Sequence, residues 1–384
     1  MIIPYIADVY GGPSRVAKAL ANSIGQQHMQ QIDLISTVAD GIEKLSVSKN
    51  TWLQEEGYRL QYFDCFHRND LVISYSLMAW VYKHLKDYDV VHTHNIFSPM
   101  MSVVRWLCDR QNIPYITTPH GMLEPWALAN KSSKKKLYYE WLEAKSLQRS
   151  GAIHTLNQQE SDNIQALGFS RLEILPNGIR QSEFEKLIDP EFFYQHFPET
   201  KDKDIILFLS RVDPKKGLDL LIPAFSSIRG QFPNSHLVIA GPDSVGFMPT
   251  VQSYLQAADC ENAVTITGML TGDLKQAALA AANVYALTSY SEGFSMSVLE
   301  GMAAGLPCMI TTACNFPEAG EAGVAKVVDI EIESITEALT ELLDDLPKAK
   351  AMGSAARDFV FQEYTWNKIS AKLISVYKSL VTPR

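Results

Sequence analysis

The chain opens with a short apolar strand, a glycine turn and a helix, and this order constrains its fold more than any other feature. Residues 2–7 are mostly apolar, and the turn after them contains Gly11 and Gly12. A helical stripe of apolar side chains follows over residues 15–24. A strand, a glycine turn and a helix in this order are typical of the start of a parallel α/β sheet.

The alternation of strands and helices then runs through the chain twice. Strands are expected in the first half at residues 32–37, 88–95, 114–121, 151–157 and 171–179, and in the second half at residues 204–212, 235–242, 263–270, 283–291 and 306–312. Helices are expected at residues 76–86, 100–111, 133–149, 218–232, 251–260, 274–282, 298–305 and 366–380. We therefore predict an α/β protein with two doubly wound, Rossmann-like halves that face each other across a cleft.

A polar stretch with scattered aromatic residues separates the two halves. Because 384 residues exceed the usual size of a single hydrophobic core, two domains are expected. The N-terminal domain is predicted over residues 1–178, the linker over 179–203 and the C-terminal domain over 204–363. The last helix, about residues 364–384, is expected to pack back on the N-terminal domain.

Composition excludes several classes of protein. A net charge of −9 argues against a dedicated binder of duplex nucleic acid, which needs a basic surface. The five cysteines are an odd number and form no CxxC pair, as is typical of buried thiols in a reducing compartment. There is no basic leader, and no apolar run reaches the roughly 18 residues that a membrane span needs. A cytoplasmic protein with no nucleic-acid partner is predicted.

Two cations follow the first strand of the second half. Arg211 and Lys216 stand on one strand-to-helix connection, and ligands of open α/β sheets lie beyond the carboxyl ends of the strands. A guanidinium and an ammonium group can converge there on a diphosphate, although two solvated loop cations are the alternative interpretation. In the first half, Gly11 and Gly12 precede a helix N-terminus, whose free amides attract an anion. Glycine in such a turn can also serve tight packing alone.

Two glutamates, Glu292 and Glu300, lie in an apolar segment with seven residues between them. Glu292 precedes a predicted helix, whose first free amides form another anion site around residues 294–297. Glu300 lies inside that helix, so the two carboxylates are on the order of 10 Å apart. A carboxylate accepts two hydroxyl groups at once, so one glutamate can bind a ribose and the other a sugar. The alternative is a helix N-terminal charge at Glu292 and a solvated helix residue at Glu300.

Several motifs together resemble one family along the whole chain. SEGFSMSVLEGMAAGLP, residues 291–307, resembles the Glu-x7-Glu motif of the retaining family-four glycosyltransferases (glycosyl transferases group 1), which have the GT-B fold. YGGPSRVAKALA resembles the N-terminal glycine loop of that family, DVVHTHN and TPHG its N-domain strand ends, ILPNGI its domain junction, and FLSRVDPKKGLDLLIPAF its phosphate-binding Arg-x4-Lys. The resemblance implies two Rossmann-like domains and a nucleotide diphosphate sugar as donor.

The resemblance also implies roles for individual residues. Arg211 and Lys216 bind the diphosphate, Glu300 binds the ribose, and Glu292 binds hydroxyl groups of the donor sugar. His120, in TPHG, matches a histidine that faces the sugar, and together with Glu292 it is the catalytic candidate. The other donor-binding residues that the resemblance implies are Gly11 and Gly12 under the phosphate, Met269 and Leu270 around the base, and Phe294, Ser295 and Met296 through their backbone.

Other histidines and acidic residues are given structural roles. His92, His94 and His154 stand at neighbouring strand ends and are interpreted as hydrogen-bonded sheet residues. Asp202 and Asp204 form an Asp-x-Asp sequence in the predicted linker, where solvated charge is the simpler interpretation. No metal site is predicted, and no cofactor beyond the donor itself. A UDP-sugar is favoured as donor, with GDP-mannose as the second choice.

A cationic and aromatic segment lies in the N-terminal half, over residues 123–141. It contains Trp126 and three consecutive lysines, Lys134, Lys135 and Lys136. Such a surface can bind a glycan or lipid-linked acceptor, or rest on the inner face of an anionic membrane. A surface helix with a solvated cationic face explains the same residues equally well.

The prediction is a retaining, metal-independent hexosyltransferase that transfers a sugar to a glycan or lipid-linked acceptor in cell-surface polysaccharide biosynthesis. Two alternatives remain from the sequence: a sugar-nucleotide epimerase on a similar two-domain frame, and a non-catalytic protein that binds a nucleotide sugar. A dinucleotide-dependent oxidoreductase lacks support, because YGGPSR does not match G-x-G-x-x-G.

Overall fold

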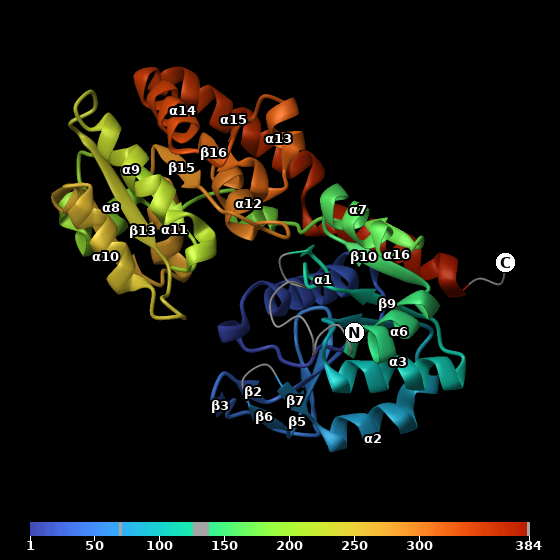
Figure 1. The fold of residues 1–384 in the computed structure, drawn as a ribbon. Helices are drawn as coiled ribbons and strands as arrows, with labels where there is room; N and C mark the ends of the chain where they lie inside the picture. The colour runs from blue at the N-terminus through green and yellow to red at the C-terminus, as the bar shows by residue number, and fades with distance from the viewer. Residues whose placement is uncertain (69–70, 126–137, 382–384) are drawn as a thin grey trace. The chain divides into compact units, whose positions relative to one another are not determined.

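The protein folds into two compact units. The computed structural model describes residues 1–68, 71–125 and 138–381, with the side chain of Asp8 left aside. The N-terminal unit comprises Met1–Asn177 and Trp366–Arg384, and the C-terminal unit comprises Gly178–Thr365. Figure 1 shows strands flanked by helices in each unit. The mixed α/β architecture with parallel sheets confirms the predicted fold class.

The sheet of the N-terminal unit is built around the first residues of the chain. Ile2 pairs in parallel with Ile35 on one side and with Thr93 on the other, so it joins two groups of strands into one sheet. The order across this sheet is β4, β5, β1, Ile2, β8, β9, β10 and β11. Its strands are β1 (Asp33–Thr37), β4 (Trp52–Gln54), β5 (Arg59–Phe63), β8 (Val91–His94), β9 (Tyr115–Thr118), β10 (Ala152–Thr155) and β11 (Leu172–Ile174). The strand order reverses at Ile2, which makes this position a topological switch point.

Helices and two small hairpins complete the N-terminal unit. The helices are α1 (Gly12–His28), α2 (Tyr75–His84), α3 (Pro99–Gln111), the π-helix η3 (Tyr139–Glu143), α6 (Ala144–Arg149), α7 (Gln158–Ala166) and α16 (Trp366–Val381), with short 3-10 turns η1 (Asp8–Tyr10) and η2 (Leu85–Asp87). The hairpins pair β2 (Ala39–Asp40) with β3 (Glu43–Lys44) and β6 (Phe66–Arg68) with β7 (Leu71–Ile73). Side-chain caps at Ser98 and Asn157 fix the starts of α3 and α7 at the ends of β8 and β10.

The last helix, α16, is part of the N-terminal unit. It contacts α1, where Ser370 Oγ and Ser23 Oγ lie 2.8 Å apart. Its Tyr377 hydroxyl lies 2.7 Å from Nδ1 of the buried His92 in β8. Helix α16 therefore packs on the N-terminal unit, although it lies far from the rest of that unit in sequence (Figure 1).

The C-terminal unit contains a six-stranded parallel sheet in the order β14-β13-β12-β15-β16-β17. Its strands are β12 (Asp204–Leu209), β13 (Ser235–Ala240), β14 (Val264–Gly268), β15 (Val284–Leu287), β16 (Cys308–Thr311) and β17 (Ala325–Val328). Most residues of these strands are apolar, and β13, β15 and β16 are buried along their full length. The strand order reverses between β12 and β15, so these two strands flank the switch point of this sheet.

Helices cover this sheet (Figure 1). They are α8 (Pro190–His196), α9 (Leu218–Ile228), α10 (Met248–Ala257), α11 (Gly272–Ala281), α12 (Met296–Ala303), α13 (Pro317–Glu321), α14 (Ile332–Asp344) and α15 (Leu346–Glu363). Short 3-10 turns occur at η4 (Gln181–Glu183), η5 (Pro198–Thr200), η6 (Pro214–Lys216), η7 (Glu261–Ala263) and η8 (Thr312–Cys314). Helix α9 packs against α14, and α12 packs against α15.

The segment predicted as a linker, residues 179–203, is structured and differs from that expectation. It contains α8, whose Phe193 is 1% exposed and which packs against α11. Asp189 caps α8 by accepting the Glu191 amide at 2.9 Å. The Arg357 side chain also donates to the carbonyl oxygen of Phe184 at 2.7 Å. These contacts attach the segment to the C-terminal unit, since buried aromatic side chains hold it there.

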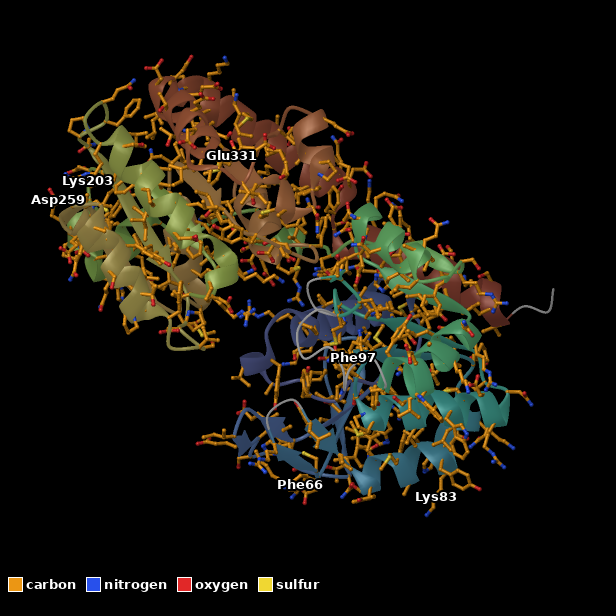
Figure 2. The ribbon with its side chains drawn as sticks, in the orientation of Figure 1. Phe66, Lys83, Phe97, Lys203, Asp259 and Glu331 are labelled. Atoms are coloured by element: carbon orange, nitrogen blue, oxygen red, sulfur yellow. The ribbon has the colours of Figure 1, made fainter. Side chains whose placement is uncertain are left out.

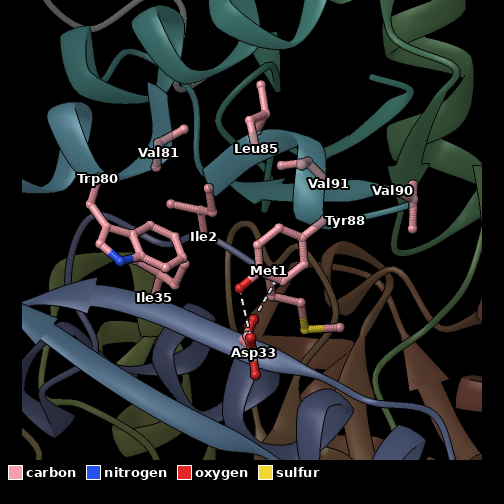
Figure 3. Close-up of a pocket in the computed structure, with 10 residues that line it drawn as sticks. All are labelled: Met1, Ile2, Asp33, Ile35, Trp80, Val81, Leu85, Tyr88, Val90 and Val91. Atoms are coloured by element: carbon pink, nitrogen blue, oxygen red, sulfur yellow. Dashed lines mark hydrogen bonds between the residues drawn. The ribbon is translucent and has the colours of Figure 1, made fainter. Parts of the chain in front are cut away.

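One small pocket lies in the N-terminal unit at the edge opposite the expected ligand edge. It is lined by Met1, Ile2, Asp33, Ile35, Trp80, Val81, Leu85, Tyr88, Val90 and Val91. Asp33 and Val91 begin β1 and β8, so the pocket lies at the amino ends of these strands. The Tyr88 hydroxyl donates to the Asp33 carboxylate at 2.6 Å, and the Met1 amine donates to the Asp33 carbonyl oxygen (Figure 3). Because ligands of such sheets bind at the carboxyl ends, we assign no ligand to this pocket.

The described residues also bear on membranes, metals and thiols. Across residues 1–68, 71–125 and 138–381, no helix is both long and apolar enough to span a bilayer. In the same ranges, no cluster of three or more histidine, cysteine or acidic side chains is arranged to hold a metal ion. All five cysteines are free and buried.

Candidate functional site

The switch point of the C-terminal unit places two loops side by side, one after β12 and one after β15. Asp213 caps the short turn η6 in the first loop, accepting the Lys215 amide at 2.9 Å. Gly217 ends that turn with a φ of 69°, and a Cβ on it would lie 1.9 Å from the carbonyl oxygen of Thr288. The two loops therefore touch through their backbones, which only glycine permits at this position.

Lys216 and Glu292 meet across these two loops. The Lys216 Nζ lies 2.5 Å from Oε1 of Glu292, and their side chains are 10% and 11% exposed. The Ser289 hydroxyl donates to the same carboxylate oxygen at 2.5 Å. The backbone of Glu292 is fixed as well. The Glu292 amide donates to the Ala313 carbonyl oxygen, and the Asn315 side chain donates to the Glu292 carbonyl oxygen. The sequence analysis assigned different parts of the donor to Lys216 and Glu292, whereas in the structure their side chains form one ion pair.

The other cations of this loop differ in their surroundings. Arg211 is exposed, and within the described part of the chain no hydrogen bond or ion pair involves its side chain. Lys215 is half-buried, and burial lowers its pKa, against an opposing effect of Glu292. The positive charges of Lys216 and Arg211 lower the pKa of Lys215 further. Three cations therefore crowd one loop, and together they favour an anionic ligand.

Helix α12 begins directly beyond this ion pair. Ser295 caps it and accepts the Val298 amide at 3.4 Å, which leaves earlier amides of the first turn available. Gly301 packs so close to Tyr285 of β15 that a Cβ on it would lie 2.8 Å from the tyrosine ring. The Tyr285 hydroxyl donates to Ser297 Oγ at 2.8 Å. These contacts hold the helix N-terminus at the carboxyl end of β15.

Phe294 and Met296 flank this N-terminus. Phe294 is 7% exposed, and its ring packs against Phe316 and Tyr364 at centroid distances of 5.0 and 5.8 Å. Its side chain is therefore part of an aromatic cluster, and only its backbone lies at the helix start. Met296 is the first residue of α12.

Glu300 has a partner that the sequence analysis missed. The Lys275 Nζ, on α11, lies 2.8 Å from Oε1 of Glu300, and the side chains are 21% and 14% exposed. No local pattern connects a lysine and a glutamate that lie 25 residues apart. The carboxylate is thus held between two helices rather than solvated on one.

Met269 and Leu270 follow β14, at the same edge of the sheet. Met269 is 50% exposed and Leu270 is 6% exposed. Gly268, with a φ of 71°, turns the chain just before them. Met269 is therefore an exposed apolar side chain at the carboxyl edge of the sheet that also carries the cations.

The glycine turn of the N-terminal unit is open. A Cβ on Gly11 or Gly12 would meet no heavy atom within 4 Å. Gly11 has a φ of 75°, which favours glycine, but no packing contact demands glycine at position 12. Tight packing against the described residues therefore does not explain this pair; the positive φ accounts for glycine at position 11 only.

His120 lies two residues beyond β9, with a φ of 55°. Its Nε2 lies 3.0 Å from Nδ1 of His94. Burial lowers the pKa of His120 to about 3, so the imidazole is neutral at neutral pH. The neighbouring Gly121 amide donates to Glu160 Oε1 at 2.7 Å, and the Leu156 amide donates to Glu160 Oε2 at 2.7 Å. Burial raises the pKa of Glu160 to about 7.

The other histidines form a buried chain beside it. His92 Nε2 and His154 Nδ1 both contact Thr118 Oγ1, at 2.6 and 2.9 Å, and His154 Nε2 lies 2.6 Å from the Leu175 carbonyl oxygen. The interpretation as hydrogen-bonded sheet residues therefore fits His92 and His154. It does not fit His94 fully, because the Nε2 atom of His94 is buried and has no hydrogen-bond partner in the described part of the chain.

The aromatic and lysine-rich segment lies outside the described residues. Trp126, Lys134, Lys135 and Lys136 all fall within residues 126–137.

Comparison with known proteins assigns the family. Residues 191–359 match the profile described as "Glycosyl transferases group 1", and residues 10–183 match "Glycosyltransferase Family 4", so the two profiles together span most of the chain. The chain belongs to the group 1 glycosyltransferases. This glycosyltransferase is similar to solved structures of the GT-B fold. One is the HepE protein of Anabaena in complex with UDP and glucose, at 18% identity, with 99% of this chain and 100% of that chain covered and a TM-score of 0.77.

Curated relatives of the glycosyltransferase include lipid mannosyltransferases. A GDP-mannose-dependent alpha-(1-6)-phosphatidylinositol monomannoside mannosyltransferase of Mycobacterium tuberculosis is 30% identical over 211 residues, covering 53% of this chain and 54% of the relative. A phosphatidyl-myo-inositol mannosyltransferase of Mycolicibacterium smegmatis is 24% identical over 396 residues, covering 99% of this chain and 93% of the relative. The chain thus spans about half the length of the first of these relatives.

Proposed function

We propose that this protein is a retaining, metal-independent hexosyltransferase that uses a nucleotide diphosphate sugar as donor. The observation that carries the proposal is the buried Lys216–Glu292 pair at the switch point of the C-terminal sheet. The pair belongs to the two loops that also carry the exposed Arg211 and the capped start of α12. A cation pair and a helix N-terminus fit a diphosphate, while an acceptor-only carboxylate fits sugar hydroxyl groups.

In this proposal, the site residues of the C-terminal unit bind different parts of the donor. Arg211 and Lys216 bind the diphosphate, with backbone amides of the turn from Phe294 to Met296. The Lys216 ammonium has three donors, so it can retain Glu292 while it contacts a phosphate oxygen. Glu292 then accepts hydroxyl groups of the hexose. Glu300, held by Lys275, accepts the ribose hydroxyl groups, and Met269 with Leu270 frames the base.

The N-terminal unit contributes the remaining parts. Gly11 and Gly12 allow the donor phosphate to approach the start of α1. The neutral imidazole of His120 offers a hydrogen bond to the sugar without adding charge. The bond between the anomeric carbon and the diphosphate breaks, and the acceptor hydroxyl attacks from the face that the diphosphate leaves. The departing diphosphate takes the hydroxyl proton, and the cations stabilise its negative charge.

The donor and acceptor are proposed from the relatives. HepE was solved with UDP and with UDP-glucose, and several curated relatives are named as GDP-mannose-dependent. We propose a UDP-sugar first and GDP-mannose second. For the acceptor we propose a glycan or a lipid-linked sugar of cell-surface polysaccharide, reached in the cytoplasm at the inner membrane face. The five free, buried cysteines support a reducing compartment.

Release of free nucleotide tests the function. We expect the purified protein to release UDP from a UDP-sugar, or GDP from GDP-mannose, and to continue at an unchanged rate after a chelator is added. A requirement for a divalent ion would contradict the metal-independent mechanism. An altered nucleotide sugar without free nucleotide would indicate an epimerase, and binding without turnover would indicate a non-catalytic binding protein.

Replacing Arg211 with alanine tests the diphosphate assignment. We expect the affinity for the nucleoside diphosphate to fall about 10-fold or more, because a charge-assisted hydrogen bond contributes roughly 1.5–3 kcal/mol. The fold should not change, since the side chain is exposed and no contact within the described part of the chain depends on it. Isothermal calorimetry measures the affinity. Lys203→Ala is the control, because Lys203 is an exposed cation of the same unit (Figure 2). Equal affinities in the two variants would refute the assignment.

A further inference from the structure

The loop after β8 contains buried polar atoms that have no hydrogen-bond partner among the described residues. Asn95 is 1% exposed, and within residues 1–68, 71–125 and 138–381 neither its Oδ1 nor its Nδ2 has a partner. In the same ranges, Nε2 of His94, the last residue of β8, is also buried without one. A buried polar group without a partner costs about 1–3 kcal/mol, and native proteins contain few of them. Three such atoms on two consecutive residues suggest that a bound ligand supplies their hydrogen bonds.

These atoms lie at the position where a sheet of this kind binds ligands. Ile2 marks the reversal of strand order in the N-terminal sheet, and β8 is its neighbour. Asn95 is the first residue beyond the carboxyl end of β8, and its amide donates to the Thr118 carbonyl oxygen at 3.0 Å. His94 contacts His120 through its other ring nitrogen. The unpartnered atoms are therefore next to the proposed sugar-facing histidine.

A buried ion pair holds the loop in place. Arg105 and Glu143 are paired and fully buried. The Arg105 guanidinium donates to the Asn95 carbonyl oxygen at 3.4 Å, and Glu143 accepts the Phe97 amide at 3.1 Å. Phe97 is labelled in Figure 2. A fully desolvated charge pair is costly unless it is well bonded, and here its contacts fix the backbone at the Asn95 carbonyl group and at the Phe97 amide, just after the Asn95 side chain.

The conformation of this backbone also excludes a simple alternative. Asn95 has a φ of 69° and Phe97 a φ of 56°. Asparagine tolerates the left-handed region by hydrogen bonding its side chain to nearby backbone, but the Asn95 side chain makes no such bond. Local turn chemistry therefore does not account for the amide.

We propose that the Asn95 carboxamide, with Nε2 of His94, binds a hydroxyl group of one of the reacting sugars. The inference rests on the proposed function and adds a residue that selects the sugar. A carboxamide donates and accepts, and a sugar hydroxyl does the same, so one hydroxyl satisfies both residues. The hydroxyl belongs either to the donor hexose or to the acceptor, which share this chemistry.

Replacement of Asn95 by glycine is the cleanest variant. Glycine adopts the φ of 69° without strain, so the substitution removes the amide and keeps the backbone. Because the lost atoms are unpartnered, we expect the unfolding temperature of Asn95→Gly to be no lower than that of a matched control, Asn112→Gly. Asn112 also has a left-handed backbone, with a φ of 55°, but it is exposed at the end of α3. A clear loss of stability relative to this control would show that the amide serves the fold, and would overturn the proposal.

Binding separates the two sources of the hydroxyl. Calorimetry compares UDP with UDP-glucose, and GDP with GDP-mannose, on the wild-type protein and on both variants. If the donor supplies the hydroxyl, Asn95→Gly loses about 10-fold in affinity for the nucleotide sugar and none for the nucleotide, since tenfold corresponds to about 1.4 kcal/mol. If the acceptor supplies it, both affinities stay unchanged. The rate of transfer to the methyl glycoside that the wild type uses best then falls about 10-fold, while donor hydrolysis in water does not.

Two results would overturn this inference and leave the proposed function intact. One is wild-type affinity and wild-type transfer in Asn95→Gly. The other is an equal loss of affinity for nucleotide and nucleotide sugar, which would place Asn95 away from any sugar hydroxyl. A wild-type protein that neither binds nor cleaves these nucleotide sugars would overturn the proposed function, and with it this inference.

Discussion

Lys216→Ala is expected to lower the free energy of unfolding by about 3–5 kcal/mol and to reduce sugar transfer by a factor on the order of 10² to 10³. The stability loss follows from the remaining partner. Glu292 is 11% exposed, and without Lys216 its carboxylate keeps only the bond from Ser289 among the side-chain contacts of the described residues. The loss of transfer follows from the leaving diphosphate, which no longer has an ammonium group beside it.

A second substitution separates these two effects. In Lys216→Ala combined with Glu292→Gln, the unpaired charge is gone, so most of the stability should return while transfer stays lost. Lys201→Ala is the control for an ordinary ion pair, because Lys201 and Glu191 are 3.1 Å apart but about half exposed. Such pairs contribute at most about 1 kcal/mol. Urea unfolding and initial transfer rates measure both quantities. Transfer near the wild-type rate in Lys216→Ala would rule out its contact with the diphosphate.

The sequence was sufficient to predict the alternation of elements but not their pairing. Strands such as β12 and β13 contain a continuous apolar run and end at a polar turn, so their type could be predicted. The first strand was predicted over residues 2–7, but the structure pairs only Ile2, because Pro4 has no amide to continue a ladder. The linker prediction failed because α8 is short and its burial depends on α11, which lies far along the chain.

The candidate site shows the same limit. Lys216 and Glu292 could be singled out because both follow strands, but their contact depends on β12 lying next to β15, which the sequence does not state. Lys275 went unnoticed because it lies inside a helix, away from any strand end. Asn95 belongs to a motif that the family resemblance included, yet only the structure shows that its amide has no partner. Residues at strand ends are visible in a sequence, whereas contacts between elements are not.

The buried histidines of the N-terminal unit make its stability depend on pH. Burial lowers the pKa of His120 to about 3 and of His154 to about 4, and it lowers the pKa of His92 and His94 well below the ordinary value of 6.5. Below pH 6.5 these histidines bind protons in the unfolded chain but stay neutral in the folded unit. The free energy of unfolding therefore falls as the pH falls. Each histidine contributes on the order of 1.4 kcal/mol per pH unit until its folded pKa is reached.

One carboxyl group opposes this trend. Burial raises the pKa of Glu160 from 4.5 to about 7. Between these values the folded unit binds a proton that the unfolded chain has released, so this group alone makes the unit more stable as the pH falls from 7 to 4.5. Its effect cancels that of about one histidine. The net loss between pH 6 and pH 5 is therefore about 4 kcal/mol, the contribution of roughly three histidines.

Hydrogen exchange of the β8 and β9 amides measures this loss, because these strands lie in the sheet that holds the histidines. In His92→Gln, we expect the slope of the free energy of unfolding against pH to decrease by about one proton, or about 1.4 kcal/mol per pH unit. His196→Gln should leave the slope of the N-terminal unit unchanged, because His196 belongs to the C-terminal unit. A slope in His92→Gln equal to that of the wild type would mean that the folded unit accepts a proton on His92. In that case, the hydrogen-bonded series from Tyr377 through His92 and Thr118 to His154 would not depend on a neutral His92.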